Sequence, residues 1–301
     1  MSMELITGEP PIPQRPSAGH KGTFGQALIC AGSPGMSGAA ALAGLGALRS
    51  GAGLVRLAVP SGLVPVVAAL EPSYLLLGLS EDAEGRVGEG AEVELREAAG
   101  RATAMAMGPG WGRSEFLDQL AASLYETLEC PLLVDADALN ALAAAGTLEP
   151  GCSPAAGRVL TPHPGEMARL LGGEVSSVES DREGVAGELA LRSGAVVVLK
   201  GPGTVITDGR RLVVNSTGNS GLATGGSGDV LSGLVTGLLA RGMSPFEASW
   251  LGVYLHGLAA DLAVVELGES ALIASALPDW IPAAFGVAEA GGVVEVDSGE
   301  N

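Results

Sequence analysis

The sequence predicts an α/β fold in which helices cover a largely parallel central sheet. From Gln26 onward, short apolar runs that end in glycine or proline alternate with amphipathic segments of about helix length. Such alternation is typical of parallel strands that are joined by helical crossovers. The 301 residues are enough for one large domain or two small ones, and we expect one.

The element boundaries follow from the same pattern. Strands are expected where the apolar runs are short, at 27–31, 54–59, 73–79, 102–107, 132–134, 158–160 and 196–199. A hairpin is expected where the runs 204–207 and 212–215 flank the turn at Asp208 and Gly209. Helices are expected at 37–49, 114–128, 138–145, 164–171, 182–193, 229–240 and 245–267. The apolar segment 250–267 and the glycine-rich helix 37–49 could pack internally or against another subunit, so a homo-oligomer stays open.

The two ends of the chain lack this alternation. Residues 1–17 contain several prolines and no periodic apolar pattern, so they are interpreted as either an extended arm or a disordered leader. Residues 288–301 are expected to form an acidic C-terminal tail. The single α/β domain is therefore placed at residues 18–287.

Composition excludes several classes of partner. The 34 acidic and 16 basic residues give a net charge of −18, which repels nucleic acid and anionic lipid, so we expect neither as a partner. No uninterrupted apolar run reaches the roughly 18 to 20 residues that cross a bilayer, and no signal segment opens the chain. Three cysteines are too few for a disulfide framework. These features predict a cytoplasmic protein.

Glycine-rich loops follow several of the predicted strands, where ligands bind in open α/β sheets. They lie at residues 32–38, 108–112 and 200–204. The chain has only two lysines, Lys21 and Lys200, and each precedes a glycine, whereas the P-loop needs lysine before Ser or Thr. None of the loops has the three spaced glycines of the dinucleotide fingerprint in the required context. A P-loop enzyme and a conventional dehydrogenase are therefore disfavoured.

The segment 215–233 carries the strongest local signal. Gly225, Gly226 and Gly228 let backbone amides converge on an anion, and the start of the following helix adds partial positive charge there. The loop is therefore expected to hold phosphate. Asp229 lies in the first helical turn, where it is either a capping carboxylate or a general base beside a phosphoryl group. The open, glycine-rich approach favours the base.

Several motifs occur in a fixed order along the chain. They are KGTFG at 21–25, GAA at 38–40, RSGAG at 49–53, DADALN at 135–140 and TPHPGE at 161–166, followed by the Asp229 loop. With these motifs the sequence resembles the ADP- or ATP-dependent NAD(P)H-hydrate dehydratases, a branch of the ribokinase-like superfamily, over roughly residues 18–285. The resemblance implies a three-layer α/β/α sandwich with a mostly parallel central sheet.

The resemblance also implies a repair reaction. A reduced nicotinamide dinucleotide that carries a hydroxyl at ring carbon 6 would meet ADP or ATP, together with Mg²⁺. Phosphorylation of the hydroxyl makes a good leaving group, and the ring nitrogen lone pair then expels phosphate to restore NADH or NADPH. Bacterial relatives often carry a preceding epimerase domain, for which residues 1–17 leave no room, so we expect a separate NAD(P)H-hydrate epimerase chain in the pathway.

Residue roles follow from the matched motifs. Asp229 would be the catalytic base and would contact the substrate, together with Ala40, Gly110 and His163. Glu166 would help to hold Mg²⁺ through water, and Asp137, with Asp135, could organise the same ion or cap the helix that follows. The nucleotide and its phosphates would be held by Lys200, Gly201, Pro202, Gly203, Thr204, Gly225, Gly226, Ser227 and Gly228.

Two other functions stay open. One is a small-molecule kinase of the same fold that acts on a hydroxymethylpyrimidine or thiazole alcohol. Many such kinases have asparagine where this chain has His163, which favours the dehydratase. The other is a catalytically silent nucleotide sensor, against which the presence of both Asp229 and Glu166 argues.

Overall fold

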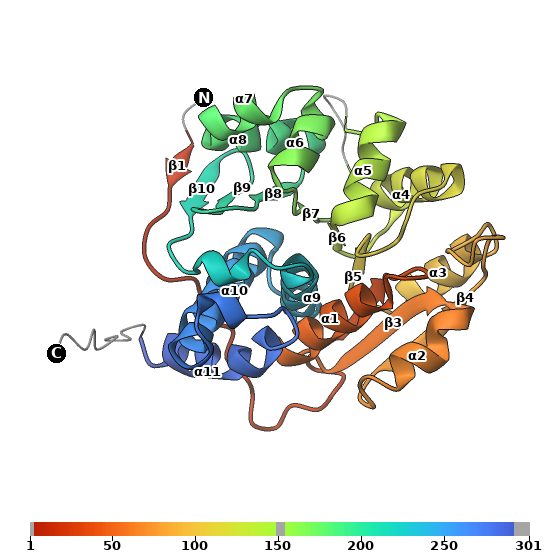
Figure 1. Cartoon of the computed structure of the whole chain (residues 1–301), viewed down its shortest axis with the longest axis horizontal. Helices are drawn as coiled ribbons and strands as arrows, with labels where there is room; N and C mark the ends of the chain where they lie inside the picture. Colours follow the sequence, from red (N-terminus) through yellow and green to blue (C-terminus); the bar gives the residue numbers. More distant parts are fainter. Residues whose placement is uncertain (1–2, 149–153, 292–301) are drawn as a thin grey trace.

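One sheet of ten strands runs through residues 3–148 and 154–291, which are the residues that the computed structural model describes. The spatial order of the strands is β1-β10-β9-β8-β7-β6-β5-β2-β3-β4 (Figure 1). Their bounds are β1 Glu4–Leu5, β2 Gln26–Cys30, β3 Leu54–Pro60, β4 Leu75–Leu79, β5 Ala104–Met107, β6 Leu132–Val134, β7 Arg158–Leu160, β8 Val196–Leu199, β9 Val205–Thr207 and β10 Arg211–Val214.

The strands from β8 to β4 in this order are all parallel, so their carboxyl ends lie at one edge of the sheet. The exception among the described strands is β9, which is antiparallel to both β8 and β10, whereas β10 and β1 run parallel to each other and in the same direction as β8. The predicted hairpin is confirmed, because Val213 pairs with Ile206 across the turn at Asp208 and Gly209. Ligand-binding loops are therefore expected along the shared carboxyl edge.

Helices cover both faces of the sheet, which confirms the three-layer α/β/α sandwich (Figure 1). One face is covered by α1 Ser37–Arg49, α2 Val64–Ala68, α9 Ser227–Ala240, α10 Pro245–Leu267 and α11 Leu277–Glu289. The other is covered by α3 Ala91–Ala99, α4 Glu115–Thr127, α5 Ala136–Ala145, α6 Pro164–Leu171, α7 Val175–Ser180 and α8 Arg182–Ser193.

Alternate strand residues supply the two cores. Ala27 and Ile29 of β2 join the core under α9, whereas Leu28 and Cys30 join the core on the opposite face. All four side chains are fully buried, which explains why the parallel strands appear in the sequence as continuous apolar runs. The central strands are therefore held on both sides, and the loops that follow them have a rigid base.

Helix α10 is the longest apolar segment of the fold. By length and composition it could cross a membrane, but 67% of its most apolar window is buried inside the domain, as in the core helix of a globular protein. It packs against α9 and α11, and α1 also packs against α9. Of the two alternatives for these segments, the structure shows internal packing.

The sequence pattern missed α2, α3, α7 and α11. Only Ala91, Leu95 and Ala99 of α3 are buried, so its apolar stripe is one residue wide. Helix α11 contains Pro282, and proline in a sequence ordinarily indicates a helix break. Short or proline-containing helices depend on tertiary packing that the sequence does not display.

The segment before β2 lies along the domain. Strand β1 pairs with β10, and Ile6 and Ile12 pack against the core. The Arg15 guanidinium lies 3.7 Å from the centre of the Phe24 ring. Most of the expected acidic tail, from residue 292 onward, lies outside the described residues, and so does Cys152.

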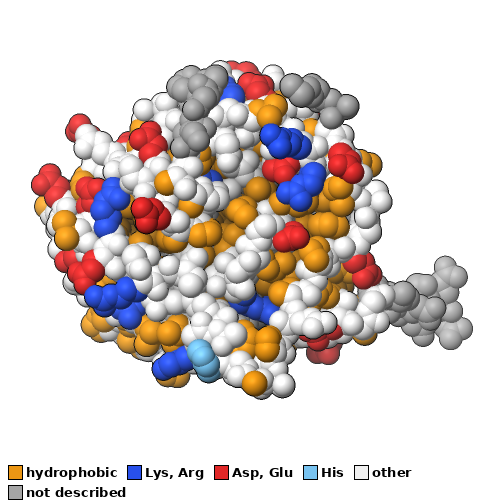
Figure 2. All heavy atoms as spheres, turned by 180° about the vertical axis from the view of Figure 1, so that it is seen from behind, with side chains coloured by type: hydrophobic (Ala, Val, Ile, Leu, Met, Phe, Trp, Pro, Cys, Tyr) orange, Lys and Arg blue, Asp and Glu red, His pale blue; other side chains and the backbone are white. Residues whose placement is uncertain are grey.

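Acidic and basic side chains are scattered over the face that Figure 2 shows, with no continuous basic patch. Apolar side chains gather toward the middle of that face. This distribution fits a chain with a net charge of −18 and gives that face no footprint for a polyanion.

Candidate active site

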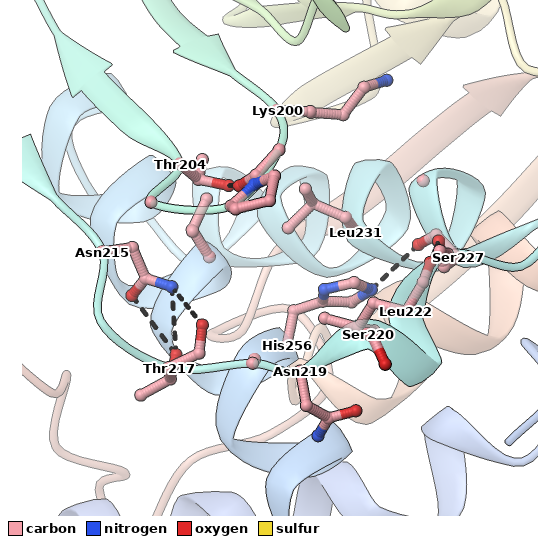
Figure 3. A pocket seen from close by; sticks show the side chains of 18 of the residues that line it. Lys200, Thr204, Asn215, Thr217, Asn219, Ser220, Leu222, Ser227, Leu231 and His256 are labelled. Atoms are coloured by element: carbon pink, nitrogen blue, oxygen red, sulfur yellow. Dashed lines mark hydrogen bonds between the residues drawn. The ribbon is translucent and has the colours of Figure 1, made fainter. Parts of the chain in front are cut away.

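A cavity of about 650 Å³ opens beside the carboxyl edge of the sheet (Figure 3). One part of its wall is the segment after β8, residues 200–204, which we call the lysine loop. Other parts are the segment 215–220, the start of α9, and residues of α10. A cavity of this size can take a nucleotide-sized ligand.

The start of α9 places free backbone amides beside this cavity. Gly226 precedes the helix with φ of 98°, a left-handed conformation that suits glycine, and a Cβ there would lie 2.5 Å from Leu42 Cδ1. Ser227 and Gly228 line the cavity, while Gly225 and Gly226 are not among the described lining residues. The helix amino end carries partial positive charge, so this part of the wall suits an anion.

The lysine loop is held by contacts from outside the cavity. Arg182 of α8 donates to the carbonyl oxygens of Leu199 and Lys200, both at 3.1 Å. Gly201 has φ of 134°, and a Cβ at this position would lie 3.1 Å from the Arg182 guanidinium. Thr204 Oγ1 closes the loop by donating to the Gly201 carbonyl oxygen at 2.9 Å. The loop is therefore a preformed structure.

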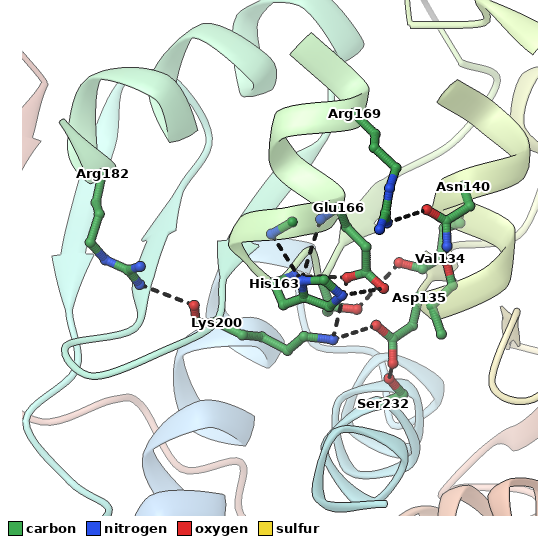
Figure 4. Close-up of polar contacts among 12 residues, drawn as sticks. Val134, Asp135, Asn140, His163, Glu166, Arg169, Arg182, Lys200 and Ser232 are labelled. Atoms are coloured by element: carbon green, nitrogen blue, oxygen red, sulfur yellow. Dashed lines mark hydrogen bonds and ion pairs between the residues drawn. The ribbon is translucent and has the colours of Figure 1, made fainter. Parts of the chain in front are cut away.

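Behind the loop lies a charged cluster, which we define as Asp135, Glu166 and Lys200 (Figure 4). Lys200 Nζ lies 2.7 Å from Asp135 Oδ1 and 3.9 Å from Glu166 Oε2. Ser232 of α9 donates to the other Asp135 oxygen at 2.7 Å. Residues that follow β6, β7 and β8 thus meet at the carboxyl edge, with α9 closing over them.

The charges within the cluster determine the protonation states of Asp135 and Lys200. Burial raises the pKa of Asp135, but the Lys200 ammonium and hydrogen bonds from Lys200, Ser232 and Thr161 outweigh burial and lower it overall. Burial lowers the pKa of Lys200, but the Asp135 and Glu166 carboxylates raise it above its ordinary value. Asp135 and Lys200 are therefore a charged pair at neutral pH.

The carboxyls of Asp229 and Glu166 differ from that of Asp135, because their pKa values are raised. Burial, with a smaller contribution from the Asp135 charge, raises the pKa of Asp229 to about 7, although Lys200 partly offsets this. Burial also raises the pKa of Glu166 to about 7 against the charge of Lys200. A Cβ at Gly228 would lie 3.6 Å from Lys200 Nζ, so the helix turn that bears Asp229 approaches the cluster closely. A carboxyl that titrates near neutral pH suits a general base.

His163 caps α6. Its Nδ1 accepts from the backbone amides of Gly165 at 3.0 Å and Glu166 at 3.3 Å, while the Glu166 carboxylate accepts from the His163 amide at 2.8 Å. This reciprocal arrangement is a capping box. Half of the His163 side chain is exposed. The histidine therefore has a structural role, and a ligand contact stays a prediction.

The other predicted residues lie on the α1 side of the charged cluster. Asp137 Oδ2 accepts from the Gly112 amide at 2.8 Å, which ties the start of α5 to the loop after β5. Ala40 is fully buried on α1, and a Cβ at Gly110 would lie 2.8 Å from Ala39 Cβ. The loop containing Gly110 thus lies against α1, and none of Ala40, Gly110, His163 or Asp229 is a described lining residue of the cavity.

The donor set fits Mg²⁺ only as an ion held largely by phosphate and water. The described residues contain no group of three or more His, Cys, Asp or Glu side chains that could hold a metal. Asp135 is committed to Lys200 and Ser232, and Glu166 Oε2 is committed to the His163 amide. Glu166 Oε1 lies 3.3 Å from His163 Nε2. Mg²⁺ often binds through one or two carboxylates plus substrate phosphates, and a contribution of Glu166 to such a site stays a prediction.

Sequence reasoning missed three residues of the site. The sequence pattern predicts a metal ligand or a helix cap at Asp135, whereas the structure shows this residue as the ion-pair partner of Lys200. The pattern indicates no role for His256, which lines the cavity, or for Arg182, which holds the lysine loop. The strained backbone at Ala136, with φ of 51°, is a further mark of a functional site that the sequence does not display.

Comparisons with known proteins show the family of this chain. The NAD(P)H-hydrate dehydratase family model matches residues 27–282. A bifunctional NAD(P)H-hydrate repair enzyme from Moorella thermoacetica is 42% identical over 273 residues, which are 90% of this chain but only 51% of that protein. The chain thus spans about half the length of that relative.

Two relatives from Bacillus subtilis match over most of their length. An ADP-dependent (S)-NAD(P)H-hydrate dehydratase is 38% identical, with coverage of 90% of this chain and 92% of that protein. The crystal structure of an ADP/ATP-dependent NAD(P)H-hydrate dehydratase, co-crystallized with ATP/Mg²⁺, has a TM-score of 0.79 and 33% identity over 92% of this chain and 94% of that one. The family match and the identity to these relatives over nearly their whole length show that this chain belongs to the NAD(P)H-hydrate dehydratase family.

Proposed function

We propose that this chain uses ADP or ATP to dehydrate the 6-hydroxy hydrates of NADH and NADPH, and so returns them to usable coenzyme. The observation that carries the proposal is the position of Asp229. Its carboxyl, with a pKa of about 7, stands on the first turn of α9, where the amino end of the helix meets a cavity of about 650 Å³. A base and an anion site therefore lie next to each other, as phosphoryl transfer to a hydroxyl requires.

The nucleotide is placed in the cavity. Its phosphates lie against the amides at the start of α9, with Gly225, Gly226, Ser227 and Gly228 as the anion hole. The lysine loop, which lines the same cavity, covers the nucleotide from the other side. Lys200 Nζ reaches the position between the anion hole and Asp135, so its charge is available to a phosphoryl group. When bound, Mg²⁺ would neutralise phosphate charge beside Glu166.

The hydrated dinucleotide is placed on the α1 side of Asp229, near Ala40, Gly110 and His163. Asp229 removes the proton of the ring hydroxyl as its oxygen attacks the terminal phosphorus of the nucleotide. The bond to the leaving AMP or ADP breaks as the new phosphoester bond forms. The ring nitrogen lone pair then expels inorganic phosphate to give an iminium ion, and loss of a proton from ring carbon 5 restores the dihydronicotinamide.

The cellular setting belongs to the same proposal. Relatives that are about twice as long are named bifunctional repair enzymes, and we infer that an epimerase activity accompanies this one. We place the protein in the cytoplasm, where the reduced coenzymes arise. The proposed substrates are small anions and not nucleic acids, so the proposal does not require an extended basic surface.

An assay of products tests the proposal. The protein is incubated with NADH hydrate, Mg²⁺ and either ADP or ATP, and the absorbance of reduced nicotinamide is followed together with inorganic phosphate. Recovery of absorbance that depends on the nucleotide supports the dehydratase. The kinase alternative is examined in parallel with a hydroxymethylpyrimidine and a thiazole alcohol, and accumulation of a stable phosphoester without absorbance recovery would contradict the proposal.

A further inference from the structure

A histidine on α10 lines the cavity and has no part in the mechanism above. His256 is 7% exposed, and its Nε2 lies 2.9 Å from the backbone carbonyl oxygen of Ser227 (Figure 3). Because a carbonyl oxygen can only accept a hydrogen bond, Nε2 carries the proton and donates. In the neutral ring, Nδ1 is then an acceptor with a free lone pair.

This second nitrogen faces the cavity. Figure 3 shows it on the side of the ring that turns away from Ser227, and no described residue donates to it. Burial, followed by the charge of Lys200, lowers the pKa of His256 to about 4, although the bond to Ser227 partly offsets this. The ring is therefore neutral at physiological pH, and its unpaired acceptor is available to a ligand.

The group that meets Nδ1 has to be a hydrogen-bond donor. Phosphate oxygens accept, so they cannot pair with it, whereas the ribose hydroxyls and the adenine amino group donate. His256 Nε2 donates a hydrogen bond to the backbone carbonyl oxygen of Ser227. Ser227 is the first residue of α9, where the phosphates are placed. The ribose is attached to the phosphates and the base lies one sugar further away. The ribose hydroxyls are therefore the donors within reach.

We propose that His256 determines the specificity of the nucleotide site, because its Nδ1 accepts a hydrogen bond from a ribose hydroxyl and so selects ribonucleotides over deoxyribonucleotides. The inference rests on the proposed nucleotide-dependent function. It assigns the side chain a direct contact with the nucleotide in addition to its bond to Ser227. A neutral acceptor suits this task, since a cationic histidine would bind phosphate and ignore the sugar.

The bond to Ser227 needs a separate control, because any replacement of His256 could also loosen the start of α9. His256→Gln keeps an amide nitrogen that can reach the Ser227 carbonyl oxygen, but it leaves no acceptor at the position of Nδ1. His256→Ala removes both contacts. His20→Gln is the matched control, since His20 is an exposed histidine outside the cavity. Thermal melting of each variant verifies that it is folded.

Calorimetric titration with ADP, 2′-deoxy-ADP and 3′-deoxy-ADP, in the presence of Mg²⁺, tests the inference. The unmodified protein and His20→Gln should bind ADP about 2- to 10-fold more tightly than one of the two deoxy analogues, as expected for one hydrogen bond. His256→Gln should bind ADP more weakly by a similar factor and should no longer distinguish ADP from that analogue. Loss of discrimination in a folded variant identifies a direct contact.

Three results would overturn the inference. His256→Gln could discriminate as the unmodified protein does, which would leave His256 with the Ser227 contact alone. The unmodified protein could bind both deoxy analogues as tightly as ADP, or could discriminate only against inosine diphosphate, which would make the adenine amino group the donor. If the unmodified protein bound no nucleotide at all, the proposed function would fail as well, so the two failures are distinguishable.

Discussion

The cavity wall and the charged cluster share Lys200, but they differ in how they hold charge. The wall presents backbone amides that suit an anion and a neutral histidine that can accept a hydrogen bond from a ligand. The cluster holds its own ions, with Asp135 2% exposed and already paired to Lys200 at 2.7 Å. The wall therefore has groups that can contact a ligand, while the cluster fixes the electrostatic field around the Asp229 carboxyl.

The largest effect is predicted for Asp229, whose replacement should abolish most of the turnover. Asp229→Asn keeps the shape and the position on the first turn of α9 but removes the proton acceptor, so turnover should fall by about 100- to 10,000-fold. Nucleotide affinity, measured by calorimetry, should change little because the amides of the wall remain. Asp279→Asn, on the exposed first turn of α11, is the matched control and should have normal turnover. Near-normal turnover of Asp229→Asn would remove Asp229 from the mechanism.

The next effect concerns Lys200, which belongs to both regions. Lys200→Ala should raise the apparent dissociation constant for the nucleotide, because a charge beside a bound phosphate stabilises ground and transition states alike. It should also lower the free energy of unfolding by about 3–5 kcal/mol, since Asp135 stays buried without its cation. Urea unfolding measures this loss.

Two variants sharpen the Lys200 result. Asp135→Asn combined with Lys200→Ala should regain much of the lost stability, because no unpaired charge remains. Lys21→Ala, which truncates the other lysine of the chain at an exposed position, should be neutral. If Lys200→Ala were as stable as the unmodified protein, the buried ion pair would not organise the cluster.

A smaller effect is expected at His163, where a structural and a ligand role have to be separated. His163→Ala removes the cap of α6 and should cost about 0.5–2 kcal/mol of stability. His163→Asn should keep the cap, since asparagine is among the best N-cap residues. A loss of affinity for the hydrated dinucleotide in the folded asparagine variant would therefore report ligand contact, and unchanged affinity would leave His163 with the cap alone.

The smallest effect is the pH dependence of stability. Asp229 has a folded pKa of about 7 against an ordinary value of 3.8, so its contribution is fully present below that ordinary value and is lost as pH rises through 7. Between pH 6 and 8, the decline in unfolding free energy should be smaller in Asp229→Asn than in the unmodified protein by about 1 kcal/mol. Equal declines in urea unfolding would show that burial does not raise the pKa of Asp229.

The two regions also differ in how well the sequence predicted them. The glycine turn at 225–228 and the lysine loop were recognisable because close approach and a left-handed φ, as at Gly226, leave a local trace in the residue types. The charged cluster left no such trace. Asp135 and Lys200 are 65 residues apart, and Asp135 and Ser232 are 97 residues apart, so only the fold brings them together.

The same contrast applies to the elements. Strands β6, β7 and β8 lie where the apolar runs predicted them, because a strand buried on both faces has a continuous apolar sequence. Helices α5 and α9 begin two residues before their predicted starts, at Ala136 and Ser227. At both places the chain turns directly from the site into the helix. Helix starts that form part of a site follow the geometry of the site, so sequence periodicity locates them poorly.

The most direct test of the central claim is the ratio of products in one reaction. NADH hydrate is supplied in limiting amount with excess ADP and Mg²⁺, and reduced nicotinamide and inorganic phosphate are measured at completion. A nucleotide-driven dehydration predicts equal amounts of NADH and phosphate, with neither formed when ADP is omitted or when Asp229→Asn replaces the unmodified protein over the same time. Phosphate release without recovery of NADH, or NADH recovery without phosphate, would contradict the claim that phosphorylation of the hydroxyl drives the loss of water.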